Sequence, residues 1–245
     1  MSSGRRESAE EKQFLEKYRP KDYARPSVAV DLVIFTIIDA QLRVLLVKRQ
    51  EHPFKGEWAL PGGFVRVGES AKDQGEDLDT AARRELQEET GLEPERVHIE
   101  QLYTFGRSGR DPRMRVIAVT YFALVRPDLA PFVKAGGDAS HAQWLPVEAL
   151  KKAELAFDHR EIIETGLARV RGKLEYSGIA FDLVPLTFTI PELRHVYSIV
   201  LDREMDPGNF RRKFNRMLDD GLIEQAPGKR ITASKPATVY RFKRR

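Results

Sequence analysis

The decisive stretch of the sequence is Arg84-Glu85-Leu86-Gln87-Glu88-Glu89-Thr90-Gly91-Leu92. It ends an amphipathic helix that we predict from about Leu78 to Thr90, because the glycine of this stretch stands where a helix-terminating glycine is expected. In that helix Glu85, Glu88 and Glu89 occupy positions i, i+3 and i+4, so three carboxylates project from one face. The stretch therefore predicts an acidic site carried on a helix.

Three carboxylates so close together repel one another, and we expect a divalent cation to resolve that repulsion. Oxygen-only ligands favour a hard ion such as Mg²⁺, which bridges carboxylates to ligand phosphates. Gly62-Gly63, upstream of the helix, would let backbone amides come close to a pyrophosphate. Glu85, Glu88 and Glu89 are thus the candidate metal ligands and, if the site is active, the candidate catalytic residues. The alternative is an acidic helix face that is merely solvated.

Strands and helices are mixed around this helix. β-Branched and apolar runs predict a hairpin, and further runs predict more strands and a second long helix. The expected hairpin strands are 27–35 and 43–48, the later strands are 64–65, 100–105, 115–125 and 142–145, and the second helix is 157–176. This mixture predicts one α+β sandwich.

The segment 105–113, between two of these strands, carries three arginines and two glycines. Arginines in such a loop can clamp phosphate with two hydrogen bonds each. We take Arg110, Asp111 and Arg113 as candidate ligand contacts, with an exposed turn of solvated charges as the alternative. Further candidates are Arg49, Trp58, Gly62 and Gly63, although tryptophan is more often a core residue than a base-stacking platform. The five histidines show no metal-ligand spacing, and we expect them to be structural or on the surface.

A different pattern begins near residue 181. Thr189-Ile190-Pro191-Glu192 has the form of a capping box and predicts the start of a helix, and Asp206-Pro207 predicts the start of a second. The second helix has an apolar stripe of Phe210, Phe214 and Met217, with basic residues on its other face. Strands at 222–224 and 238–242 follow. Two helices and then a hairpin describe a winged helix-turn-helix.

The charge of the chain supports a DNA partner for this part. The formal net charge is +4, yet residues 206–245 hold eleven Lys or Arg against four Asp or Glu. Such a basic segment suggests a polyanion partner, while a charged, solvated face or a protein-docking module is the alternative. The candidate DNA contacts are Asn209, Arg211, Arg212, Lys213, Asn215, Arg216, Lys229, Arg230 and Lys235.

The rest of the composition excludes several classes of protein. The chain has 245 residues, no cysteine and no apolar run near the length that crosses a bilayer. Residues 1–24, with alternating charges and no signal-peptide core, are expected to form a frayed or short helical arm. We therefore expect no membrane association and a cytoplasmic location.

The stretch 84–92 matches the core of the Nudix box. The full box has a glycine, five residues, a glutamate, seven residues and then the Arg-Glu core, whereas twelve residues separate Gly63 from Glu76 here. Either Glu76 or Glu69 can serve as the box glutamate, and in both cases seven residues are inserted, around 70–75. We prefer Glu76, because it directly precedes the helix and could pair with Arg84.

Nearly the full length resembles the NrtR group of Nudix-related transcriptional regulators, through 58–65, the box core, 109–113 and 209–213. The resemblance implies a Nudix α/β/α sandwich over 25–180 and a C-terminal winged helix-turn-helix domain over 181–245. It also implies a homodimeric repressor of NAD-metabolism genes on a palindromic DNA operator, released when ADP-ribose binds. The alternative is a Mg²⁺-dependent ADP-ribose pyrophosphatase. Because of the insertion beside the metal helix we expect hydrolysis to be weak or lost, since small displacements of catalytic groups cost large factors in rate.

Overall fold

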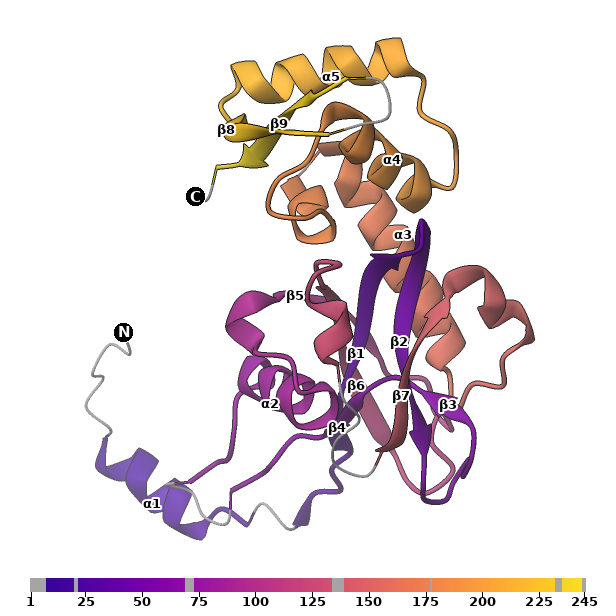
Figure 1. Ribbon diagram of the computed structural model, residues 1–245. Helices are drawn as coiled ribbons and strands as arrows, with labels where there is room; N and C mark the ends of the chain where they lie inside the picture. The colour runs from indigo at the N-terminus through magenta and orange to yellow at the C-terminus, as the bar shows by residue number, and fades with distance from the viewer. Residues whose placement is uncertain are drawn as a thin grey trace.

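The computed structural model describes residues 8–19, 22–68, 73–133, 139–176, 178–231 and 235–243. Within these ranges the chain forms a large mixed sheet with helices on both faces, and a smaller helical unit with a two-stranded sheet (Figure 1). No helix in the described ranges is both long and apolar enough to cross a bilayer.

The large sheet is built around one central strand, β1 (Ser27–Ile38). β1 pairs antiparallel with β2 (Gln41–Arg49), which confirms the expected hairpin, and parallel with β6 (Val116–Leu124). The strand order is β3-β2-β1-β6-β5, with β4 on β1 and β7 on β2. The remaining bounds are β3 (Trp58–Ala59), β4 (Gly62–Phe64), β5 (His98–Phe105) and β7 (Ala139–Pro146).

Alternation along β1 sends its side chains to two cores. Leu32 and Ile34 pack under α2 (Leu78–Thr90), whereas Val33 and Phe35 face α3 (His159–Tyr176) on the other side. Two helical layers around one sheet give the expected α/β/α sandwich. Short 3₁₀ helices connect these elements: η2 (Pro94–Arg96), η3 (Ala130–Phe132), η4 (Val147–Lys152) and η5 (Gly178–Leu183).

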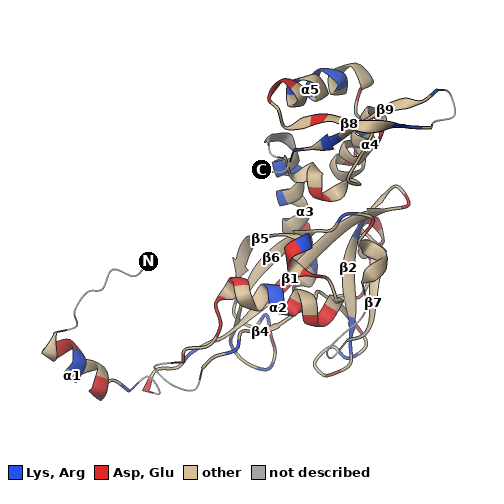
Figure 2. Cartoon of the chain, turned by 60° about the vertical axis from the view of Figure 1, so that its left-hand side comes forward, with Lys and Arg blue, Asp and Glu red and all other residues tan. Residues whose placement is uncertain are grey.

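The N-terminal arm contains one short helix, α1 (Ala9–Lys17), which begins at the capping residue Ser8. It buries no side chain and stands apart from the sheet in Figures 1 and 2. The expected short helical arm is thus present over the described part of 1–24, which excludes residues 1–7, 20 and 21.

The C-terminal unit is a winged helix, as expected. α4 (Ile190–Leu201) begins with the predicted capping box, and α5 (Pro207–Asp219) begins at the capping residue Asp206. The hairpin β8 (Ile223–Arg230) and β9 (Ala237–Phe242) forms the wing. β8 is longer than the predicted 222–224, because an irregularity between Gln225 and Lys229 accommodates the Pro-Gly pair and the strand then resumes.

One hydrophobic cluster joins the two units. Val33 and Phe35 of the large sheet belong to the same cluster as Phe210 and Phe214 of α5, with residues of α3, η5 and α4 in between. A change in the packing of α3 would therefore affect both the large sheet and the winged helix, because close-packed interiors transmit strain.

Candidate functional site

The acidic face of α2 is held by an arginine of the same helix. Arg84 Nη1 donates to Glu85 Oε1 at 2.6 Å and to Glu88 Oε2 at 2.9 Å, and Arg84 Nη2 donates to Glu76 Oε1 at 2.5 Å. Arg66 adds a bond to Glu88 Oε1 at 3.0 Å. The guanidinium groups of Arg84 and Arg66 therefore offset part of the negative charge of this face. Sequence spacing did not show which basic side chains fold back onto the carboxylates, and the divalent cation expected here stays a prediction.

The pairing of Glu76 with Arg84, our reason for choosing Glu76 as the box glutamate, is confirmed. Hydrogen bonding from Arg84 lowers the pKa of Glu76 to about 2. Glu69 and residues 70–72 of the insertion lie outside the described residues. Burial raises the pKa of Glu85, although Arg84 opposes the shift. Among the described residues, no three carboxylate or imidazole side chains are gathered as a ready metal site.

The two glycines that begin β4 lie between this helix and β1. A Cβ on Gly63 would stand 2.3 Å from Glu85 Oε1, and a Cβ on Gly62 would stand 2.2 Å from the Val30 carbonyl oxygen. The Gly62 amide donates to Glu89 Oε2 at 3.1 Å. Glycine is therefore required at 63 for contact with the helix and at 62 for contact with β1. The Gly62 amide that we expected near a pyrophosphate is bonded to Glu89.

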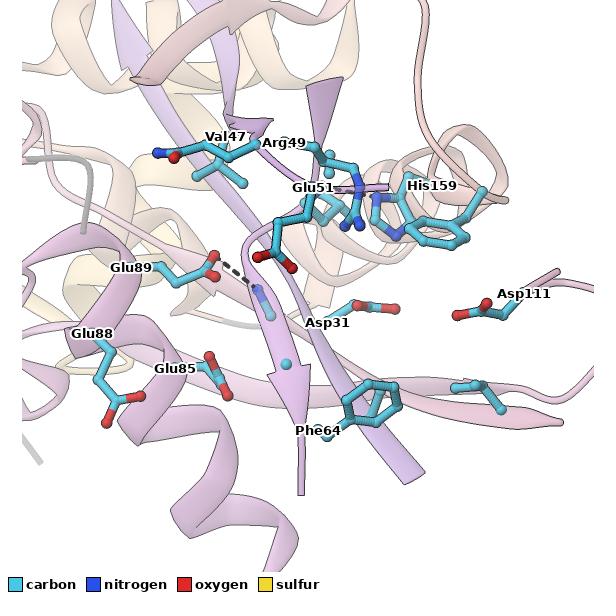
Figure 3. A pocket seen from close by; sticks show the side chains of 18 of the residues that line it. Asp31, Val47, Arg49, Glu51, Phe64, Glu85, Glu88, Glu89, Asp111 and His159 are labelled. Carbon is cyan, nitrogen blue, oxygen red and sulfur yellow. Dashed lines mark hydrogen bonds between the residues drawn. The ribbon is translucent and has the colours of Figure 1, made fainter. Parts of the chain in front are cut away.

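A cavity of about 460 Å³ opens over this strand and helix, within the size range of small-molecule sites. Figure 3 shows Glu85, Glu88 and Glu89 on one wall, with Arg49, His159 and Asp111 across the cavity. Asp31, Glu51 and Phe64 also line it. The acidic helix face and the loop arginines, far apart in sequence, thus surround one cavity.

The far wall combines guanidinium and aromatic groups. The Arg49 guanidinium lies 4.9 Å from the centre of the Phe157 ring, and the Arg113 guanidinium lies 6.0 Å from it. Burial and then the positive charge of Arg113 lower the pKa of Arg49. Two like charges beside one aromatic ring favour a ligand that brings negative charge and a flat, apolar group.

Arg110 is buried and bonded to two carboxylates, rather than exposed on a loop. Its side chain is 5% exposed and donates to both oxygens of Asp158, at 2.9 and 2.6 Å, and to Asp31 Oδ2 at 3.4 Å. Burial opposes its charge, but these carboxylates raise the pKa of Arg110. Arg110 thus lines the cavity and at the same time holds two buried carboxylates that come from distant parts of the chain, and its assignment as a ligand contact stays a prediction.

Asp111 also has a supporting position. Its buried carboxylate accepts from Arg113 Nε at 3.1 Å, Nη2 at 2.8 Å and the Arg113 amide at 2.9 Å. Hydrogen bonding from Arg113 lowers the pKa of Asp111. Arg113, with 42% of its side chain exposed, stays at the cavity in a fixed orientation.

Trp58 does not line the cavity. It packs beside the core cluster, with Lys48 Nζ 5.6 Å from its ring centre, while its neighbours Ala59 and Leu60 face the cavity. Trp58 thus has the core position that is usual for tryptophan, and nothing in the described part of the structure supports its assignment as a ligand contact.

Several cavity residues were missed from sequence. His159 is 3% exposed and lines the cavity, and its Nδ1 accepts from the Leu60 amide at 2.9 Å, so Nε2 carries the proton in the neutral ring. Burial lowers the pKa of His159. Asp31 could have been found, since it is the one charged residue in the apolar run of β1. Phe157 has a left-handed backbone, with φ of 54°, which no sequence pattern announced.

The second candidate surface is the outer face of α5. Its buried stripe is Phe210, Phe214 and Met217, as predicted. The face away from this stripe is exposed and basic, and Figure 2 shows α5 at the end of the molecule away from the large sheet. The exposed candidates on α5 are Asn209, Arg211, Arg212, Asn215 and Arg216.

The other four basic candidates need separate description. Lys213 is partly buried with its ammonium 4.8 Å from the Tyr197 ring centre, so it packs between α4 and α5. Arg230 donates to Glu192 Oε1 at 2.6 Å and to the Thr187 carbonyl at 3.0 Å. These contacts tie the wing to the start of α4, and the assignment of Arg230 as a DNA contact stays a prediction. Lys229 and Lys235 are exposed on the wing.

Comparisons with known proteins match both units. The model of the NUDIX domain matches residues 28–166, and the model of the NrtR DNA-binding winged helix domain matches residues 180–242. The chain is 35% identical over 232 residues to the "ADPR responsive transcriptional repressor NtrR" of Acinetobacter baylyi, covering 95% of this chain and 88% of the relative. It is 40% identical over 153 residues to an ADP-ribose pyrophosphatase of Methanocaldococcus jannaschii, covering 62% of this chain and 79% of the relative.

A third relative has known structures. The crystal structure of Shewanella oneidensis NrtR complexed with a 27mer DNA matches with a TM-score of 0.74 and 35% identity, over 88% of this chain and 93% of that one. The NUDIX domain of the same protein complexed with ADP ribose matches with a TM-score of 0.55 and 36% identity, over 65% of this chain and 98% of that one. Family models, relatives and structures agree across both units. The chain therefore belongs to the Nudix family and, within it, to the NrtR group of Nudix-related transcriptional regulators.

Proposed function

We propose that this chain is a DNA-binding transcriptional repressor whose Nudix cavity binds ADP-ribose, and that this ligand releases it from its operator. The observation that carries the proposal is the presence, in two units joined by one hydrophobic cluster, of a mixed-charge cavity and an exposed basic helix. Relatives named for an ADPR response and solved with DNA or with ADP ribose support each half.

In the cavity, we assign the diphosphate to the region between the acidic helix and the two arginines Arg49 and Arg113. Glu85, Glu88 and Glu89 form an all-oxygen donor set that suits a divalent cation, and we propose Mg²⁺. Such an ion would supply positive charge for the diphosphate. Arg84, bonded to Glu85 and Glu88, would then compete with the cation for the same oxygens.

On the DNA side, we propose that α5 enters the major groove, with Arg211, Arg212 and Arg216 contacting phosphates or bases. Asn209 and Asn215 would read adenine edges, and Lys229 and Lys235 of the wing would contact the backbone. We further propose a homodimer on a palindromic operator of NAD-metabolism genes in the cytoplasm, with domains at 25–180 and 181–245 after an arm at 1–24.

The test is a titration of operator binding against ligand. With a labelled palindromic operator, we expect binding that weakens steeply with salt and is released by ADP-ribose, with NAD and ATP as comparison ligands. Binding must weaken with ADP-ribose if the ligand prefers the free form. An operator affinity that saturating ADP-ribose leaves unchanged would reject the sensor role and leave a plain DNA-binding protein.

The second candidate function is hydrolysis of ADP-ribose to AMP and ribose 5-phosphate. It is favoured by the pyrophosphatase relative and by the intact Arg-Glu core, and weakened by the inserted residues before Glu76. Release of AMP should be measured with Mg²⁺, with Glu88→Gln and Glu89→Gln as variants. Metal-dependent turnover that both changes abolish would establish the enzyme, and absence of turnover in the unchanged chain would reject it.

A further inference from the structure

Helix α3 runs from the ligand cavity to the DNA-binding unit. It has 18 residues and spans roughly 27 Å at 1.5 Å per residue. Its first residue, His159, lines the cavity, while Val170 and Leu174 near its other end share a cluster with Val196 and Val200 of α4. Figure 1 shows α3 passing from the sheet up to α4. One rigid element therefore touches both functional regions.

At the cavity end, α3 is fixed by polar contacts. Asp158, which directly precedes the helix, is bonded through both oxygens to Arg110, and the same arginine reaches Asp31 on β1. His159 accepts from the Leu60 amide. A ligand that contacts Asp31 or His159 thus bears on the groups that position the first turn of α3.

At the other end, Arg171 makes polar contacts between α3 and the winged helix. Its Nε donates to the Val200 carbonyl at 2.8 Å, and its Nη2 lies 3.7 Å from Asp202 Oδ2. Val200 lies in the last turn of α4, whose carbonyls lack partners within the helix, and a cation there suits the helix dipole. Asp202 has a left-handed backbone and begins the turn that leads to α5. Arg171 therefore holds the connection from which the proposed recognition helix starts.

We propose that α3 transmits ligand binding from the cavity to the winged helix, and that Arg171 is the positioning residue through which it acts on α4 and α5. The inference rests on the proposed function, and it deepens that function by naming the route of regulation. A ligand changes operator affinity only through an element that is arranged differently in the two states. α3 can serve as that element, because its two ends are fixed to the two sites by separate contacts.

The chain supplies a matched control on the same helix. Arg169 has the same exposed side-chain fraction as Arg171, 37%. It donates to one backbone carbonyl, that of Leu102 at 2.9 Å, and lies 3.8 Å from one carboxylate, that of Glu100. Both partners belong to β5 of the large sheet. The two arginines thus make equivalent contacts, one within the Nudix unit and the other to the winged helix.

The experiment measures the ratio of operator dissociation constants with and without saturating ADP-ribose, using the full-length chain. We expect Arg171→Gln to reduce this ratio by about 2- to 30-fold, the range in which changes along a coupled network act. Arg169→Gln should keep the ratio of the unchanged chain. ADP-ribose affinity, measured by calorimetry without DNA, should be the same in both variants.

Asp202→Asn is the second variant, since 72% of this side chain is exposed and asparagine also accepts a left-handed backbone. It removes the charge partner of Arg171 without disturbing a core, and it should lower the ratio in the same direction. A ratio retained in Arg171→Gln and Asp202→Asn, or lowered equally in Arg169→Gln, would overturn the inference alone. A ratio of one in the unchanged chain would instead reject the proposed sensor function, and with it this route.

Discussion

The arginines of the cavity and those of α5, the proposed DNA-binding helix, are used in opposite ways. In the cavity, Arg84 and Arg110 are largely buried, and each bonds two or more carboxylates. On α5, Arg211 and Arg216 are exposed and make no ion pair with the residues that the structure describes. The cavity thus holds its charges in internal pairs, whereas the helix leaves them available for a partner.

This difference shows how an arginine that stabilises the fold can be told from one that binds a partner: the first is buried and paired, and the second is exposed. A buried arginine with satisfied donors costs stability when it is removed, because its carboxylates remain behind without a partner. An exposed arginine without a partner costs little in folding and much in binding to a polyanion.

The largest effect is expected at Arg110. Arg110→Met should lower the free energy of unfolding by about 3–5 kcal/mol, since it leaves the buried carboxylates Asp31 and Asp158 without their cation. Urea unfolding followed by circular dichroism measures this. Asp158→Asn in the same chain should recover part of the loss, and Arg113→Met, on a half-exposed pair, should cost less. A loss below that of Arg113→Met would show that Arg110 does not hold the two carboxylates as described above.

A smaller effect, on binding rather than folding, is expected at α5. Arg212→Ala and Arg216→Ala, one turn apart on the exposed face, should each weaken operator binding by about 1–3 kcal/mol. ADP-ribose affinity and unfolding should be unchanged. Arg241→Ala is the control, because this exposed wing arginine is paired with Glu224 at 2.7 Å. Unchanged operator affinity in both α5 variants would mean that another surface binds DNA.

The smallest effect is expected from pH at His159. Burial lowers the pKa of His159 in the folded protein below 6.5, so the unfolded chain binds the proton more readily. The stabilisation by the neutral ring is complete above pH 6.5 and is lost as the pH falls below it. His159→Gln removes this proton linkage, so its free energy of unfolding should fall less than that of the unchanged chain between about pH 7.5 and pH 5.5. Parallel pH profiles would contradict the prediction.

Local patterns of the sequence were sufficient for much of the fold. The periodicity of α2 and α4, the capping box at Thr189 and the apolar runs of β1 and β2 all depend on neighbouring residues, and the structure contains each of them. The parallel pairing of β1 with β6 was not predictable in this way, because it joins residues about ninety positions apart. The length of β8 was underestimated because an irregular strand hides its own period.

The site divides along the same line. Glu85, Glu88 and Glu89 and the pair Gly62-Gly63 do line the cavity, and each set could be found because its members are neighbours in sequence. The partners of Arg110 come from β1 and from the start of α3, 79 and 48 positions away, so no window of sequence shows them. Phe157 was missed for a related reason: its place beside Arg49 depends on a left-handed backbone.

The contact of Arg84 with Glu76, Glu85 and Glu88 has a consequence for the repressor without its ligand. An enzyme needs its acidic helix only when metal and substrate are present, but a repressor acts on its genes while it has no effector. The ligand-free form of a repressor must therefore be stably folded without its effector. Because Arg84 supplies a counter-charge from within the helix, the carboxylates of α2 repel one another less when no ligand is bound. The helix can therefore stay folded in the ligand-free form, and the absence of the effector can itself control the genes.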